Sequence, residues 1–89
     1  MNTAATKTAH DHYKAAIVLR DRILDRKVNE TPVQAWAAVA RECAKAESKF
    51  FAENEGRVHG RSHQSFLNNL DRVAWYARAQ VETIARTGR

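Results

Sequence analysis

The chain has few of the residues that break helices or cross-link small proteins. Its 89 residues include only 3 glycines, 1 proline and 1 cysteine. Because glycine, proline and strand-forming runs are scarce, the composition excludes a turn-rich β fold and favours the all-α class. The single cysteine, Cys43, falls on an apolar helix stripe and excludes a disulfide framework, which is typical of a reducing compartment. We expect it to be a core thiol.

Long apolar runs are also missing. No run approaches the roughly 20 residues that a membrane-spanning helix requires. Residues 1–9 contain no apolar segment of the kind found in secretory signals. The sequence therefore predicts a protein without a membrane partner, located in the cytoplasm.

Catalytic motifs are equally scarce. The three serines, Ser48, Ser62 and Ser65, have no strand-turn-helix elbow around them, and no pair of acids has a convergent spacing. Gly56 and Gly60 are too few and wrongly spaced for a phosphate-binding loop. We therefore expect a protein that is not an enzyme and needs no cofactor.

A helical pattern dominates what is present, and its central part covers residues 32–55. Thr31 and Pro32 form a start signal, and Gly56 is a stop signal. The apolar residues recur at steps of three and four, which is helix spacing. The predicted buried stripe consists of Val33, Trp36, Ala37, Ala40, Cys43, Ala44, Phe50 and Phe51. Glu47 falls on this stripe, where a carboxylate needs a hydrogen-bond partner.

Two further helices are predicted, over about residues 8–28 and 63–87, with residues 1–6 frayed. The first has a buried stripe that includes Ile17, Ile23, Leu24 and Val28, and Leu19 widens it beyond the needs of one neighbour. Short links make consecutive helices antiparallel. We predict a single all-α domain, an up-down-up three-helix bundle; the alternative is a helical homodimer that packs the same stripes between chains.

Histidines gather at one end of such a bundle. His10, His59 and His63 are the candidate ligands for a divalent metal, with glutamates from the second helix nearby. No recognised zinc spacing is present. The simpler interpretation is that His10 and His63 cap the core while His12 and His59 lie in solvent, so no metal is expected.

Positive charge is unevenly distributed. The net charge is +5, made up of +3 in residues 1–28, −2 in residues 29–55 and +4 in residues 56–89. Two basic segments thus flank an acidic one, a pattern that favours an anionic partner, such as a nucleic acid or an acidic protein surface.

Trp75 is the most informative single residue. On a helical wheel it points away from Ala77 and Ile84, toward charged neighbours. Trp36 is predicted to be core, and so is Tyr76, at the edge of the buried stripe. Tryptophan and arginine dominate binding hot spots, and tryptophan can also stack on an unpaired base. The alternative is that an arginine lies over the Trp75 ring as a cation–π pair.

Two functional hypotheses follow. The first is a small helical interaction protein that binds a protein partner, acting as an adaptor or inhibitor of the kind that phages and mobile elements encode. The second is a nucleic-acid-binding or nucleoprotein-associated domain that uses an arginine-rich surface. The candidate binding residues are Trp75, Arg72, Arg78, Arg86, Arg57, Arg61 and Leu19.

Overall fold

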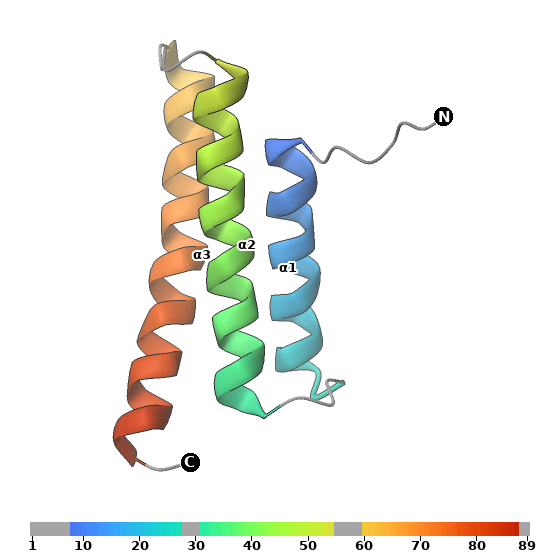
Figure 1. Cartoon of the computed structure of the whole chain (residues 1–89), viewed down its shortest axis with the longest axis vertical. Helices are drawn as coiled ribbons and strands as arrows, with labels where there is room; N and C mark the ends of the chain where they lie inside the picture. Colours follow the sequence, from blue (N-terminus) through green and yellow to red (C-terminus); the bar gives the residue numbers. More distant parts are fainter. Residues whose placement is uncertain (1–7, 28–30, 55–59, 88–89) are drawn as a thin grey trace.

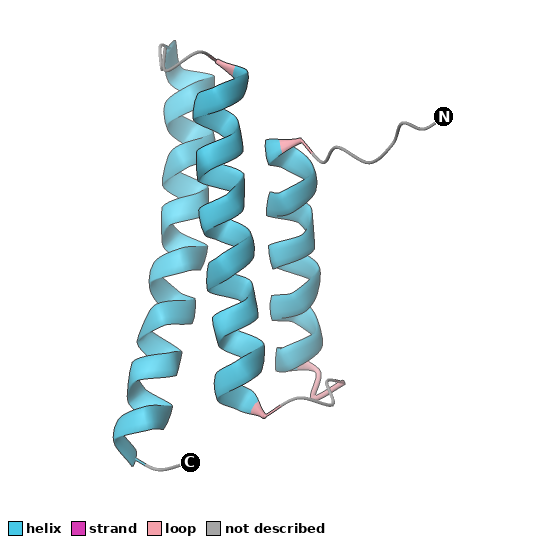
Figure 2. Cartoon of the chain, viewed as in Figure 1, coloured by secondary structure: helices cyan, strands magenta, loops and turns pink. Residues whose placement is uncertain are grey.

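The protein is a three-helix bundle. A computed structural model describes residues 8–27, 31–54 and 60–87. Its helices are α1 (Ala9–Leu24), α2 (Pro32–Glu53) and α3 (Gly60–Thr87). They run alternately up and down with α2 in the middle (Figure 1), and the described residues contain no strand (Figure 2). The predicted all-α, up-down-up architecture is confirmed.

Helix α1 begins at a capping box. The Thr8 hydroxyl accepts a hydrogen bond from the backbone N–H of Asp11 at 3.1 Å, and the Asp11 carboxylate accepts one from the backbone N–H of Thr8 at 3.0 Å. Each bond satisfies a donor that the first helical turn leaves without a partner. This pairing positions the start of α1.

The end of α1 lies earlier than the predicted residue 28. Arg26 adopts a left-handed φ of 59°, and its N–H donates to the Ile23 carbonyl at 3.0 Å. The Lys27 N–H donates to the Arg22 carbonyl at 2.8 Å. These two bonds form a Schellman motif with an arginine where glycine is usual, so the helix stops after Leu24.

The ends of α2 and α3 show one confirmed and one wrong prediction. Thr31 caps α2 by accepting from the Gln34 N–H at 3.3 Å, and Pro32 occupies the first turn, as expected. Helix α3, however, begins at Gly60, which has a φ of 81°. The predicted start at about residue 63 is therefore three residues too late, and Ser62 lies inside the helix.

The core is organised around α2, but its buried stripe differs from the predicted one. The buried residues of α2 are Ala35, Trp36, Val39, Cys43, Ala46 and Phe50. Phe51, Ala44 and Glu47 are exposed instead, so Glu47 does not lie on the buried stripe. From α3 the core receives Leu70, Val73, Ala74 and Ala77, and from α1 it receives Ala16. Small residues on the contacting faces allow the helices to approach closely.

Helices α1 and α3 each pack along α2 but hardly touch one another. Their link is an aromatic cluster at one end of the bundle. The Phe66 ring of α3 lies 4.7 Å from the His10 ring and 5.5 Å from the Tyr13 ring of α1, and it stacks on Phe50 of α2 at 4.7 Å. Farther along the bundle, a hollow lies between α1 and α3.

The described helices do not have the composition of membrane-spanning segments. None of α1, α2 and α3 combines the length and the apolar character that crossing a bilayer requires.

Candidate functional site

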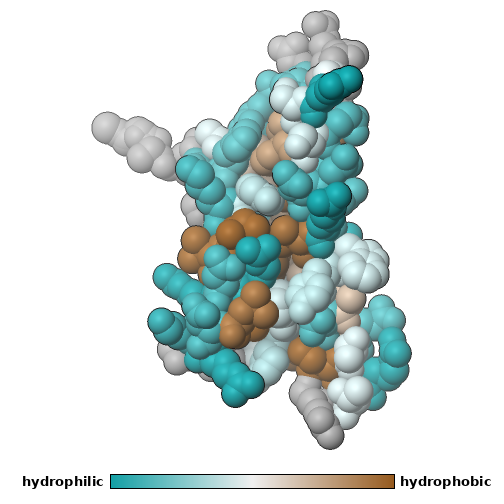
Figure 3. All heavy atoms as spheres, turned by 180° about the vertical axis from the view of Figure 1, so that it is seen from behind, coloured by the Kyte–Doolittle hydropathy of each residue, from teal (hydrophilic) through white to brown (hydrophobic). Residues whose placement is uncertain are grey.

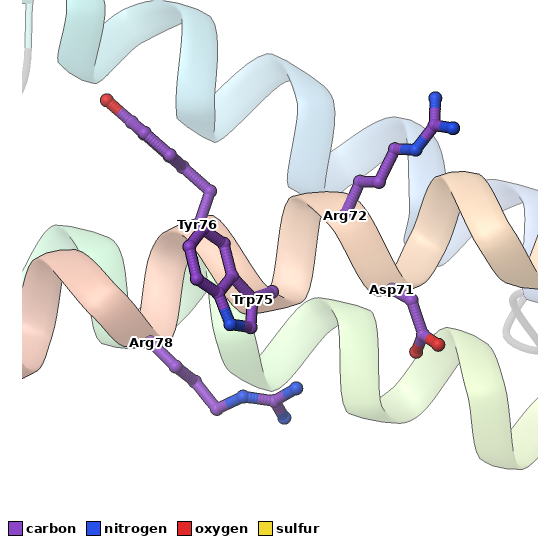
Figure 4. A pocket seen from close by; sticks show the side chains of 5 residues that line it. All are labelled: Asp71, Arg72, Trp75, Tyr76 and Arg78. Atoms are coloured by element: carbon purple, nitrogen blue, oxygen red, sulfur yellow. The ribbon is translucent and has the colours of Figure 1, made fainter.

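The candidate site lies on the exposed side of α3, in its second half. Five side chains line a shallow concavity there, and we call them the Trp75 face: Asp71, Arg72, Trp75, Tyr76 and Arg78. Figure 4 shows that Tyr76 and Arg72 point to the α1 side of α3, whereas Asp71 and Arg78 point to the α2 side. Trp75 stands between these two pairs.

Trp75 is the most exposed large apolar residue in the described part of the chain, with 69% of its surface accessible. It is exposed because the contacting face of α3 carries Leu70, Ala74 and Ala77, and Trp75 falls outside that face. No aromatic ring or cation among the described residues contacts its indole. The predicted exposure is confirmed, and the alternative of an arginine lying over the ring is not observed.

Two arginines flank Trp75 one helical turn away on either side. Arg72 and Arg78 lie three residues before and after it, and both are exposed. No carboxylate among the described residues forms an ion pair with either guanidinium. Because both charges are unpaired, they are available to an anionic partner.

Tyr76 has a double role that differs from the predicted core position. Its ring meets Trp36 of α2 edge to face, with centroids 5.3 Å apart and planes at 74°. It nevertheless keeps 42% of its surface exposed. Tyr76 therefore covers the buried Trp36 while presenting one side of its ring to the surface. Trp36 itself is core, as predicted.

A second hollow adjoins the Trp75 face on the α1 side. Its lining residues come from both outer helices, and we call it the α1–α3 groove: Arg20 and Leu24 of α1 with Arg72, Val73 and Tyr76 of α3. The Arg20 guanidinium donates to the neighbouring Asp21 carboxylate at 3.1 Å and is partly exposed. Arg20 is therefore not part of a buried ion pair.

Leu24 is the functional candidate that sequence reasoning missed. It is 58% exposed, although the periodicity of residues 8–28 placed it in the buried stripe. In a helix that continues to residue 28, Leu24 lies one turn before the end. The actual helix ends at Leu24. The only sequence signal for this early end is the cluster of polar residues after Leu24, which contains no glycine.

The remaining predicted binding residues do not join this site equally. Arg86 lies farther along the same side of α3 and binds Glu82 at 2.8 Å. Arg61 is exposed near the start of α3, about 20 Å from Trp75 along the axis at 1.5 Å per residue. Leu19 is half-buried and packs against the core, which removes it from the exposed surface. Arg57 lies outside the described residues.

The histidines form aromatic and ionic contacts. His10 packs on Phe66, and His63 meets the Phe50 ring edge-on at 5.2 Å. His12 was expected in solvent, but its Nδ1 lies 3.0 Å from Glu42 Oε1 across the α1–α2 interface, with most of both side chains covered. Among the described residues no three His, Cys, Asp or Glu side chains come together to hold a metal ion, and His59 lies outside them.

Two ionisable groups of α2 have shifted pKa values. Burial raises the pKa of the Cys43 thiol to about 11, so the thiol is protonated at neutral pH and is a poor nucleophile. For Glu42, burial alone raises the pKa, but hydrogen bonds from His12 and Lys45 outweigh it and leave the pKa of this carboxyl below its usual value. Neither group forms part of the Trp75 face.

Comparison with known proteins adds no assignment, because the chain matches no protein-family model, no curated protein and no solved structure.

Proposed function

We propose that the protein is a small non-enzymatic interaction module that binds a protein partner through the Trp75 face, acting as an adaptor or an inhibitor. The observation that supports this proposal most directly is the exposure of Trp75, at 69%, between two unpaired arginines. An exposed tryptophan side chain is unfavourably solvated in the isolated protein. Its burial by a partner removes this apolar surface from water and so favours binding. Tryptophan and arginine are the residue types that contribute most at the centres of protein interfaces.

The test compares the wild-type protein with Trp75→Ala. Immobilised wild-type protein and the variant are exposed to the same lysate of the source cells, and the proteins that each retains are identified by mass spectrometry. We expect Trp75→Ala to lose the specific partner while its melting temperature stays within a few degrees of the wild type, because the side chain packs against no described ring. Phe51→Ala is the matched control, since Phe51 is an exposed aromatic residue on α2.

Nucleic acid is the alternative partner, and one observation favours it: an exposed indole beside unpaired arginines is also suited to base stacking and phosphate contacts. Fluorescence anisotropy of labelled single- and double-stranded oligonucleotides, titrated at low and near-physiological salt, separates the two proposals. Affinity that falls steeply with salt and is lost in Arg72→Ala and Arg78→Ala favours the nucleic-acid interface. An absence of binding at low salt favours the protein partner.

A further inference from the structure

A hollow lies between α1 and α3 beside Leu24, toward the end of the bundle opposite the Phe66 cluster. The outer helices pack on α2 and hardly on each other. The α1–α3 groove between them has a volume of about 300 Å³ and draws its lining from both helices. Figure 3 views the bundle from behind and shows apolar side chains at the surface among polar ones, about halfway along the molecule.

We propose that the α1–α3 groove binds an acidic amphipathic helix of the protein partner, which lies against α1 and α3 as a fourth helix. This inference rests on the proposed function, because it names the chemistry and the position of the partner that the adjoining Trp75 face would recognise.

The apolar part of the groove suits the stripe of an amphipathic helix. Leu24 is 58% exposed at one wall, the Tyr76 ring forms the other, and Val73 lies at the base. These three residues come from two helices, so a rod-shaped ligand contacts both walls at once. Helix-in-groove recognition uses apolar anchors at steps of three and four on the ligand, which enter such a groove while its polar side faces solvent.

The charges at the groove select an acidic ligand. Among the described residues that line it, Arg20 and Arg72 are the charged ones, and none is acidic. Arg72 has no ion pair among the described residues, and Arg20 is held only by the exposed Asp21 beside it. Carboxylates that flank the apolar stripe of the ligand pair with these guanidinium groups, whereas lysines at the same places are repelled.

A second copy of the chain suits this surface less well. If two α3 helices packed antiparallel around a two-fold axis at Trp75, Arg72 of one copy would face Arg78 of the other, since both lie three residues from the axis. Like charges at these positions oppose the association. A nucleic acid suits the groove less well too, because two of its three apolar lining residues, Leu24 and Val73, are aliphatic and leave Tyr76 alone to stack on a base.

The experiment uses a displayed library of helical peptides with a constant leucine stripe and with Glu, Lys or Gln at each polar position, selected on the full-length protein. We expect the selected peptides to be rich in glutamate. Their affinity should be lost in Leu24→Glu and kept in Val18→Glu, the matched control, because Val18 is 47% exposed on α1 and does not line the groove. Both substitutions are at exposed positions, and circular dichroism confirms the fold of each variant.

Charge reversal tests the electrostatic part. Arg72→Glu should lower the affinity for the glutamate-rich peptides about fivefold, the size expected for exposed ion pairs. It should raise the affinity for a peptide in which lysines replace the glutamates. Selected peptides without an excess of glutamate, no selection above background, or binding that Leu24→Glu leaves unchanged would each overturn the inference. So would dimerisation of the wild type that Leu24→Glu abolishes, or an oligonucleotide that competes for the same groove.

The partner retained by the wild-type protein separates this inference from the proposed function. Loss of that partner in both Trp75→Ala and Leu24→Glu supports both. If Trp75→Ala loses it and Leu24→Glu keeps it, the proposed function stands and the groove inference fails. If neither variant loses it, both fail.

Discussion

The Tyr76 ring of α3 meets the Trp36 ring of α2 edge to face, with their centroids 5.3 Å apart. Trp36 is almost fully buried, and Tyr76 is one of the side chains that cover it. The neighbouring Trp75 has no such contact, so two consecutive aromatic residues have different roles. Tyr76 joins the exposed surface to the core, and Trp75 belongs to the surface alone.

This difference predicts opposite effects of two alanine substitutions on stability. Tyr76→Ala uncovers Trp36 and removes an aromatic pair, so we expect the free energy of unfolding to fall by about 1–3 kcal/mol. Trp75→Ala should change it by less than about 0.5 kcal/mol, the usual range for surface sites. Urea unfolding followed by circular dichroism measures both values. A larger loss for Trp75→Ala would place that ring in the core.

The unpaired arginines beside Trp75 predict charge-selective quenching of its fluorescence. Iodide is attracted to Arg72 and Arg78 and caesium is repelled, so iodide should quench the exposed indole more strongly at low salt. The difference should shrink as sodium chloride is added, because salt screens exposed charges.

Trp75→Phe is the control for this measurement. It leaves only the emission of buried Trp36, which should be shifted to the blue and protected from both ions. Equal quenching of the wild type by iodide and caesium at low salt would show that the two guanidinium groups do not act on the indole.

Cys43 should be unreactive in the folded protein. It is 2% exposed, so a reagent cannot reach the sulfur atom. Burial also raises its pKa to about 11, so the reactive thiolate form is scarce at neutral pH. A disulfide reagent should react with the native protein more than about a hundredfold more slowly than with the denatured one, because reaction requires opening of the α2–α3 interface.

An exposed thiol on the same helix provides the comparison. Cys43→Ala combined with Ala44→Cys puts a cysteine at the adjacent exposed position, and it should react rapidly in the folded state. Fast reaction of wild-type Cys43 would mean that α2 and α3 separate readily.

The Glu42 carboxylate predicts a loss of stability in acid. A carboxylate only accepts hydrogen bonds, so His12 Nδ1 donates to Oε1 at 3.0 Å, while Lys45 Nζ donates to Oε2 at 3.1 Å. The folded pKa of Glu42 therefore lies below its usual value of 4.5. The contribution of ionised Glu42 to the free energy of unfolding is fully present above the pKa of the unfolded chain. It is lost as the pH falls from about 4.5 through the lower pKa of the folded protein.

Chemical unfolding at pH 7 and at pH 3 measures this contribution. At pH 7 we expect Glu42→Ala to lower the free energy of unfolding by about 1.5–3 kcal/mol, the value of hydrogen bonds to a charged group. The difference between the wild type and the variant should narrow at pH 3. Lys45→Ala, which removes only the more exposed of the two partners, should cost less than Glu42→Ala. An undiminished difference at pH 3 would contradict this role of the ionised carboxylate.

Arg26 predicts a stabilising substitution. It is the only described non-glycine residue with a positive φ, and it occupies the position after the α1 cap where glycine is favoured. Arg26→Gly relieves the steric cost of the left-handed conformation, but it also makes the unfolded chain more flexible, which opposes folding. The net effect should be an increase of about 0.5–1 kcal/mol in the free energy of unfolding. Lys27 does not have a positive φ, so Lys27→Gly should be neutral or destabilising. Stabilisation by both substitutions would point to charge instead of backbone conformation.

The sequence predicts some parts of this structure well because the relevant patterns are unambiguous. In α3 the apolar residues of the buried face recur at steps of three and four, so that face and the outward direction of Trp75 both follow from spacing. In α2 many alanines surround the wheel, and an alanine fits either side of a helix. The predicted stripe therefore shares Trp36, Cys43 and Phe50 with the actual one but omits Val39 and Ala46 and includes Glu47.

The candidate groove was harder to predict for two physical reasons. Its exposed wall depends on the end of α1 at Leu24, where the left-handed residue is an arginine and not a glycine. Its openness depends on how far apart the two outer helices stand, a tertiary property that no local pattern in either helix contains.

The position of α2 between two helices that hardly meet has a consequence for folding. Each outer helix forms a hairpin with α2, and each hairpin joins segments that are neighbours in sequence. Such local contacts are typical of domains that fold in microseconds to milliseconds. Within the described residues, the contacts of the Phe66 ring with His10 and Tyr13 connect the outer helix of one hairpin with that of the other. A helix bound in the α1–α3 groove adds a second connection, so it should make the two hairpins unfold as one unit.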